Sequence, residues 1–240
     1  VTVQSTDSNA RYQHYVSGAL GDLARNLPND TAPVTGMKID YNHATADAIV
    51  DRLRAAVAST ATPGVAGAFG AFAGLYAIDD RRLLAASTDS VGSKLVLGRR
   101  GDRLRWCGAD LAAHCINDVL TTGAEPLFFL DYVAANTIDV EQVAELIEGA
   151  ADVCRAAGCA ILGGETAELP GIYRDDELDF CGTAVGVVDR DRVVDGSRVE
   201  AADVVVGFRS AGIHANGFSL VRRIVGDREF DADLLLPPTR

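Results

Sequence analysis

A helix pattern enclosed by two strand patterns, over residues 126–164, constrains the fold of this chain more than any other feature. Residues 126–135, PLFFLDYVAA, form an apolar run of strand length, and residues 159–164, CAILGG, form another. Between them, residues 139–158 repeat apolar side chains at helical spacing, with Asp139 placed to cap the start and Gly158 to end it. The inward face of this helix is expected to hold Val140, Val143, Ile147, Ala151 and Cys154.

The rest of the chain continues the mixture of strands and helices. Strands are expected at residues 83–88, 178–189 and 203–210. Helices are expected at residues 44–60, 108–123 and 216–226, the last of them capped by Asn216. The sequence therefore predicts an α/β (α+β) chain, with a mixed sheet and helices packed on it.

Composition excludes several functional classes. The 240 residues are 48% hydrophobic and 23% charged, as in ordinary globular domains, and no apolar run approaches the ~20 residues of a membrane span. The net charge of −12 argues against non-specific nucleic-acid binding, which needs clustered Lys and Arg. The five cysteines form no CxxC pair, so we expect reduced, mostly buried thiols in a cytoplasmic protein without a secretory signal.

Two glycines end the second apolar run and two carboxylates follow them. The stretch LGGETAELPG, residues 162–171, carries Gly163 and Gly164 and then Glu165 and Glu168. One interpretation is a tight turn with solvated acids. The other is a loop at a strand end whose backbone approaches a phosphate, with acids nearby to hold a metal.

Three further stretches combine small and polar residues in ways typical of ligand sites. In STDSVGSK, residues 87–94, Asp89 would end a strand, Gly92 would allow close approach, and Lys94 could reach a phosphate oxygen. The spacing is not that of a Walker loop, and a plain polar turn is the alternative.

The stretch HCINDVL, residues 114–120, places Asn117 and Asp118 on a helix, with Asp110 two turns earlier on the same side. Two such carboxylates would suit Mg²⁺, although Asp118 could equally be a solvated surface residue. In SAGIHANGFSLVRR, residues 210–223, His214 and Asn216 precede a helix and could hold an anion, or could be a loop histidine and an ordinary N-cap. Together these signals favour a nucleoside triphosphate with Mg²⁺, bound without a Walker loop.

Taken together, the stretches TDSVGSK, CINDVLTTGAEPLFFLDY, GCAILGGETAELPGIY, GTAVGVV, SAGIHANGFSLVR and LLLPPTR resemble the aminoimidazole ribonucleotide synthetase family, in order and spacing, from about Asp40 to Arg240. The resemblance implies the two-domain fold of that family and a homodimer. It also implies the reaction: ATP-dependent ring closure of formylglycinamidine ribonucleotide to aminoimidazole ribonucleotide in purine biosynthesis, with Mg²⁺.

The resemblance also implies roles for individual residues. The catalytic positions would be Lys94, His214 and Asn216. The metal would be held by Asp89, Asp110, Asp118 and Glu165. The nucleotide would be contacted by Gly67, Gly70, Asp89, Gly92, Lys94, Asn117, Asp118, Gly163, Gly164 and Glu165.

The resemblance predicts three regions of the chain, and the sequence differs from the family's pattern at some positions. Residues 1–36 are expected to be a disordered leader, 37–190 an N-terminal domain that binds ATP and dimerises, and 191–240 the beginning of a truncated C-terminal domain. Val204, Val206, Phe218 and Val221 would then be partly exposed. Ser90 and Ser93 replace a glycine and a threonine of the family's loop. A fragment that only binds nucleotide or dimerises, and a related ATP-dependent kinase, are the alternative functions.

Overall fold

The computed structural model describes residues 52–67, 70–207 and 212–237. By internal contacts the chain divides into two units, Val1–Ala46 and Asp47–Arg240, and the first of these lies outside the described residues. The predicted leader, residues 1–36, therefore lies outside them too. The described residues all belong to the second unit.

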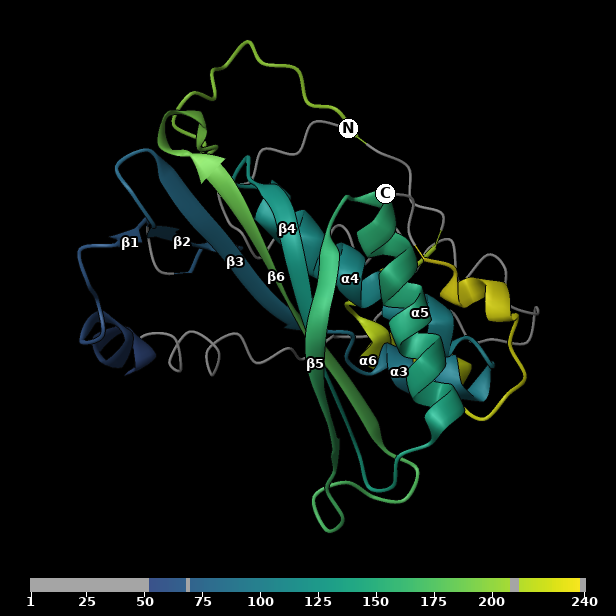
Figure 1. The fold of residues 1–240 in the computed structure, drawn as a ribbon. Helices are drawn as coiled ribbons and strands as arrows, with labels where there is room; N and C mark the ends of the chain where they lie inside the picture. The colour runs from purple at the N-terminus through teal and green to yellow at the C-terminus, as the bar shows by residue number, and fades with distance from the viewer. Residues whose placement is uncertain (1–51, 68–69, 208–211, 238–240) are drawn as a thin grey trace. The chain divides into compact units, whose positions relative to one another are not determined.

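A six-stranded sheet is the centre of this unit (Figure 1). The strands lie in the order β1-β2-β3-β6-β4-β5, with β4 and β5 parallel and all the other neighbours antiparallel. The predicted mixed sheet is thus confirmed. Its strands are β1 (Val65–Ala66), β2 (Gly74–Ala77), β3 (Arg82–Ser90), β4 (Glu125–Ala135), β5 (Ala160–Glu168) and β6 (Leu178–Asp189).

Helices connect and cover the strands. They are α3 (Lys94–Arg100), α4 (Leu104–Leu120), α5 (Val140–Ala156) and α6 (Phe218–Val225), with the 3-10 turns η1 (Arg190–Arg192) and η2 (Ala232–Leu235); residues 52–58 are also helical. The predicted boundaries of α5 are confirmed, because the Asp139 side chain accepts hydrogen bonds from the Glu141 and Gln142 amides and Gly158 has a φ of 68°. The Asn216 cap is wrong by one residue: the N-cap of α6 is Gly217.

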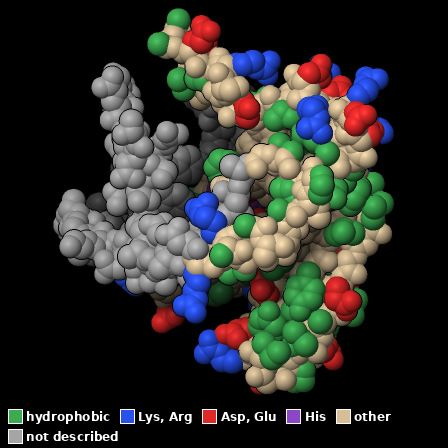
Figure 2. Space-filling model, turned by 90° about the vertical axis from the view of Figure 1, so that its left-hand side faces the viewer, with side chains coloured by type: hydrophobic (Ala, Val, Ile, Leu, Met, Phe, Trp, Pro, Cys, Tyr) green, Lys and Arg blue, Asp and Glu red, His purple; other side chains and the backbone are tan. Residues whose placement is uncertain are grey.

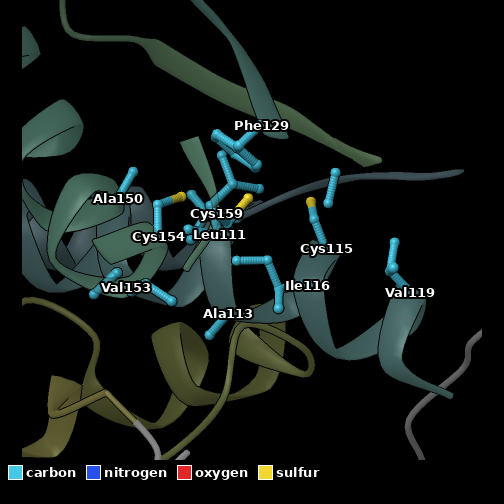
Figure 3. Packing of buried hydrophobic residues seen from close by; sticks show 14 of the residues in the cluster. Leu111, Ala113, Cys115, Ile116, Val119, Phe129, Ala150, Val153, Cys154 and Cys159 are labelled. Atoms are coloured by element: carbon cyan, nitrogen blue, oxygen red, sulfur yellow. The ribbon is translucent and has the colours of Figure 1, made fainter. Parts of the chain in front are cut away.

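The core lies between the sheet and helices α4 and α5, which cover one face of it (Figures 1 and 3). Leu111 and Ile116 of α4 and Ala150 and Val153 of α5 pack there with Phe129 of β4. The two helices touch through small residues. A Cβ added at Gly149 would lie 1.8 Å from the Arg105 carbonyl oxygen of α4, and one at Gly108 would lie 1.9 Å from the Leu146 carbonyl oxygen of α5. All five cysteines are free and four of them are buried, as expected.

The opposite face of the sheet lacks such a cover among the described residues. Along β6 the side chains alternate, with Phe180, Ala184 and Val188 buried under the helices and the intervening residues only partly buried. Tyr76 and Leu130, on the second face, are 47% and 40% exposed. Figure 2 shows apolar side chains gathered in contiguous areas on one surface of the protein, bordered by charged groups. No helix within the described ranges is long and apolar enough to cross a membrane.

Besides the Asn216 cap, four expectations about the elements are wrong. Val140 does not lie on the inward face of α5 but is 74% exposed. β5 does not end at Gly164 but pairs with β4 as far as Glu168, so the expected loop is strand. The described part of the expected strand at 203–210, residues 203–207, forms no strand and its valines are exposed, because no described strand pairs with it. Phe218 and Val221 are 2% and 3% exposed, because α6 packs them against Leu97 and Leu235.

Candidate nucleotide site

Two carboxylates meet where the end of β3 faces α4. Asp89 Oδ2 lies 3.1 Å from His114 Nε2, and its other oxygen accepts a 2.7 Å hydrogen bond from the Ser90 amide. One turn further along α4, Asp118 accepts a 2.9 Å hydrogen bond from the Ser87 hydroxyl. Asp89 and Ser87 project toward α4 because they are two residues apart on β3 and share its inner face. The fold thus brings together the two acids chosen from separate motifs.

The charges of this cluster are imperfectly balanced by protein groups. Burial raises the pKa of the Asp118 carboxyl, and the charge of Asp89 adds to the rise, whereas the Ser87 hydrogen bond and His114 oppose it. A raised pKa means that the anionic form is costly here. A bound cation would relieve that cost. The neighbouring Cys115 is not a nucleophile candidate, because burial raises its thiol pKa to about 12.

A third carboxylate, Asp131 of β4, lies in the same row of the sheet. The register places Asp89 of β3 opposite Gly182 of β6, Gly182 opposite Asp131, and Asp131 opposite Gly164 of β5. Directly opposed residues share a face, so Asp131 projects to the same side as Asp89. Burial raises the pKa of the Asp131 carboxyl. A Cβ at Gly164 would lie 2.5 Å from the Asp131 Cγ, so this glycine makes room for the carboxylate.

The loops that carry Gly67, Gly70 and Gly92 lie near the end of β3 that holds Asp89. β2 is antiparallel to β3 with Gly74 opposite Ala86, so the chain that precedes Gly74 continues toward the Asp89 end. Gly67 and Gly70 in that loop have φ values of 80° and 99°, which side-chain-bearing residues rarely adopt. Gly92 likewise has a φ of 62° and is exposed. Ser90 lies in β3 and is not strained, since Asp102 is the only non-glycine residue with a positive φ in the described ranges.

Lys94 and Asp110 have a different environment from the one expected. Both side chains are buried and form an ion pair with each other. Lys94 Nζ also donates a 2.7 Å hydrogen bond to the Ile213 carbonyl oxygen. Asp110 is therefore paired with Lys94 in this structure. The expected phosphate contact of Lys94 and metal contact of Asp110 stay predictions.

His214 approaches the cluster from the C-terminal segment. Burial lowers the pKa of the His214 imidazole, and the positive charges of Lys94 and His114 lower it further. Lys94 lies beside this turn, because its ammonium group donates to the carbonyl oxygen of Ile213, the residue before His214. Asn216, two residues on, is exposed.

The remaining predicted residues are not brought to the cluster. Asn117 is exposed on α4. Glu165 is exposed and lies opposite Tyr132, one residue past the row that holds Asp131, so it projects from the other face of the sheet. Gly163, two residues before it on the edge strand β5, lies opposite Leu130. Within one copy of the described chain, Glu165 is thus separated by the sheet from Asp89 and Asp118.

Two residues of the cluster were missed by sequence reasoning, His114 and Asp131. His114 lies one turn before Asp118 on the same helix, so the 3.6-residue period could have joined them. Asp131 interrupts the apolar run of β4, and a carboxylate in a buried strand is costly unless it is paired or binds a metal. Both signals are present in the sequence, but neither indicates which face of its element meets Asp89.

The donor set fits a metal that is completed by a ligand. In the described ranges no three His, Cys, Asp or Glu side chains converge closely enough to enclose a metal ion. Mg²⁺, however, is typically held by one or two carboxylates together with substrate phosphates and water. Asp89 and Asp118, adjacent and partly exposed, suit that mode of binding.

Comparison with known proteins agrees with the sequence motifs. Residues 70–188 match the family model described as AIR synthase related protein, N-terminal domain. The chain is 48% identical, over 210 residues, to the phosphoribosylformylglycinamidine cyclo-ligase of Anaeromyxobacter dehalogenans strain 2CP-C, covering 81% of this chain and 61% of that protein. It is 49% identical over 210 residues to the protein of the same name from Thermosynechococcus vestitus, covering 84% of this chain and 62% of that protein. The chain thus spans about three fifths of the length of these relatives.

Among solved structures, the chain is similar to T. maritima PurL complexed with ADP, with a TM-score of 0.45 and 25% identity over 55% of this chain and 21% of that one. It is also similar to AaThiL complexed with AMPPCP and TMP, with a TM-score of 0.46 and 16% identity over 69% of this chain and 48% of that one. The family model and the sequence identity to the cyclo-ligases agree with each other and with the mixed α/β sheet. On these grounds the chain belongs to the AIR synthase family and contains its N-terminal domain.

Proposed function

We propose that this chain takes part in the ATP-dependent closure of the imidazole ring of aminoimidazole ribonucleotide. The observation that carries the proposal is the 48% identity to proteins named phosphoribosylformylglycinamidine cyclo-ligase. In this reaction the γ-phosphoryl group of ATP is transferred to the formyl amide oxygen of formylglycinamidine ribonucleotide. The amidine nitrogen then attacks the same carbon, the C–O bond breaks, and ADP and phosphate are released.

The cluster at the end of β3 is suited to the phosphate end of ATP. Asp89 is oriented by His114 and the Ser90 amide, and Asp118 by Ser87, so both carboxylates are positioned before a ligand arrives. Gly92 leaves the backbone beside Asp89 open to close approach. Gly67 and Gly70 would close over the nucleotide from the loop before β2. His214, with its lowered pKa, would be a neutral imidazole at the other wall.

Mg²⁺ is the metal that we assign to this site, with Asp89 and Asp118 as its protein ligands. When bound, it would neutralise charge on the phosphate oxygens and so favour phosphoryl transfer. The negative charge of Asp89 adds to the cost of ionising Asp118, which is the physical reason to expect a cation between them and the nucleotide.

We also propose that the chain forms a homodimer through the face of the sheet opposite α4 and α5. That face carries partly exposed apolar residues such as Tyr76, Phe128 and Leu130 across adjacent strands. A second copy would bury them, and would also bring Glu165, which projects from the same face, into a shared surface. A cytoplasmic location and the absence of nucleic-acid partners remain expectations from the cysteines and the charge of −12.

Asp118→Asn tests the site. The change is nearly isosteric but removes an anionic ligand, so we expect about tenfold or greater weakening of Mg²⁺–nucleotide binding. Isothermal titration with a non-hydrolysable ATP analogue measures the affinity, and thermal melting shows whether the fold is kept. Unchanged affinity in a well-folded variant would remove Asp118 from the site.

Product analysis tests the reaction itself. Incubation with ATP and formylglycinamidine ribonucleotide should yield ADP and aminoimidazole ribonucleotide in equal amounts. Nucleotide binding without ring closure would instead favour a binding role for the chain. Phosphorylation of a different acceptor would favour the kinase alternative.

A further inference from the structure

Lys94, the first residue of α3, is enclosed by three partners. Its side chain is 0% exposed. Its ammonium group is paired with the Asp110 carboxylate of α4, donates to the Ile213 carbonyl oxygen at 2.7 Å, and lies 5.1 Å from the centre of the Phe218 ring. The buried ammonium thus has a counter-charge, a carbonyl acceptor and an aromatic ring around it.

Two of the three partners belong to the C-terminal segment. Ile213 directly precedes His214, and Phe218 is the first residue of α6. The same helix packs Val221 and Val225 against Leu97 of α3, with Trp106 at the edge of that apolar cluster. Lys94 therefore lies where the contact between α3 and the C-terminal segment begins. It contacts both ends of the turn that carries His214, at Ile213 and at Phe218.

We propose that Lys94 is a positioning residue, which anchors the turn of residues 213–218 and so fixes the position of His214, rather than a contact of the nucleotide phosphates. A phosphate contact would require the ammonium to give up Asp110 or leave the turn. The first movement would leave the buried Asp110 carboxylate without its counter-charge, and the second would leave the Ile213 carbonyl oxygen without its donor; both changes are costly. The consequence for nucleotide binding rests on the proposed function; the anchoring itself does not.

The wild-type protein allows a direct test, because Lys94 and Lys38 are its only lysines. The native chain is treated with an amine-acylating reagent, with and without a Mg²⁺–ATP analogue, and labelling is followed by peptide mass spectrometry. We expect Lys94 to stay unlabelled in both samples and to react only after denaturation. Rapid labelling of Lys94 that the nucleotide suppresses would overturn the proposal, since it would show an exposed amine at the phosphate.

Paired substitutions test the anchoring. Lys94→Met alone leaves Asp110 without its lysine, whereas Lys94→Met with Asp110→Leu replaces the ion pair by apolar groups of similar size, an exchange that buried pairs often tolerate. Trp106, the only tryptophan, reports on the contact with α6 through its emission maximum. We expect a red shift in the single variant and a return toward the wild-type maximum in the double variant.

The affinity of the double variant separates the two roles. If Lys94 only positions the turn, the double variant should bind the ATP analogue within about threefold of wild type once its Trp106 emission is restored. Restored emission with tenfold or weaker binding would overturn the proposal, because only a lost phosphate contact would explain it. A single variant with unchanged emission would overturn it as well. If no form of the chain binds the nucleotide, the proposed function fails. The acylation of Lys94 and the emission of Trp106 then still show whether Lys94 anchors the turn.

Discussion

At the scale of single residues, the contact between His114 and Asp89 matters most for the site. His114 Nε2 lies 3.1 Å from Asp89 Oδ2 and both side chains are partly buried, so the imidazole fixes the orientation of the carboxylate. Loss of a hydrogen-bonding partner of a metal-binding side chain typically lowers metal affinity by about 10- to 100-fold. We predict that His114→Leu weakens binding of the Mg²⁺–ATP analogue by about tenfold, measured by isothermal titration. His114→Gln, which keeps a side-chain donor, is the matched control and should bind more tightly than His114→Leu. Equal affinities in wild type and His114→Leu would contradict the orienting role.

Also at this scale, His214 should make the stability of the segment depend on pH. Its pKa is lowered from 6.5, chiefly by burial, so the unfolded state binds the proton more readily than the folded state. The stabilising effect of the neutral imidazole is therefore complete above pH 6.5 and is lost as the pH falls below it. We predict that the urea midpoint of wild type falls relative to that of His214→Gln as the pH is lowered below 6.5. A difference independent of pH would show that the imidazole does not titrate in this window. The comparison with the variant cancels the contributions of Asp118 and Asp131, whose raised pKa values act in the opposite direction.

At the scale of elements, the packing of α4 on α5 depends on two glycines. A Cβ at Gly149 would meet the backbone carbonyl of Arg105 at 1.8 Å, so the helices would have to separate. We predict that Gly149→Ala lowers the free energy of unfolding by about 3 kcal/mol or more, measured by urea denaturation. Gly158→Ala, at the end of the same helix, is the control. It meets no atom within 4 Å and introduces only backbone strain at its φ of 68°, at a cost of about 1 kcal/mol. Similar losses in both variants would show that helix contact is not the cause.

At the scale of the whole molecule, the sheet face that no described helix covers is the surface through which we propose that two copies associate. Leu130 is 40% exposed in the middle of β4. Burial of an unpaired carboxylate at this position against a second copy would be costly. We predict that Leu130→Asp turns the dimer into a monomer in light scattering at micromolar concentration. Val140→Asp is the control, because Val140 is 74% exposed at the start of α5 and away from this face. A monomeric wild type, or a dimer that survives Leu130→Asp, would refute the proposed interface.

The sequence by itself determined the features that are local. The span of β6 and the cap and end of α5 agree with the expectations, because helical period, side-chain capping and glycine at positive φ act over a few residues. The candidates Asp89 and Asp118 were likewise chosen from their own motifs, and they do lie close together. The resemblance to a known family, rather than periodicity, supplied the function.

Only the tertiary structure decided which side chains share a face or a cavity. The register of β4 with β5 sends Glu165 to one side of the sheet and Asp131 to the other, and a shift of β5 by one residue would have placed Glu165 on the side of Asp131. The docking of α6 turns Lys94 inward to Ile213 and Phe218, more than a hundred residues away along the chain, where a motif alone had suggested a phosphate. The pairing of strands and the docking of helices depend on the burial of surfaces that are distant in the sequence. A local sequence pattern therefore does not indicate which surface its own strand or helix will contact.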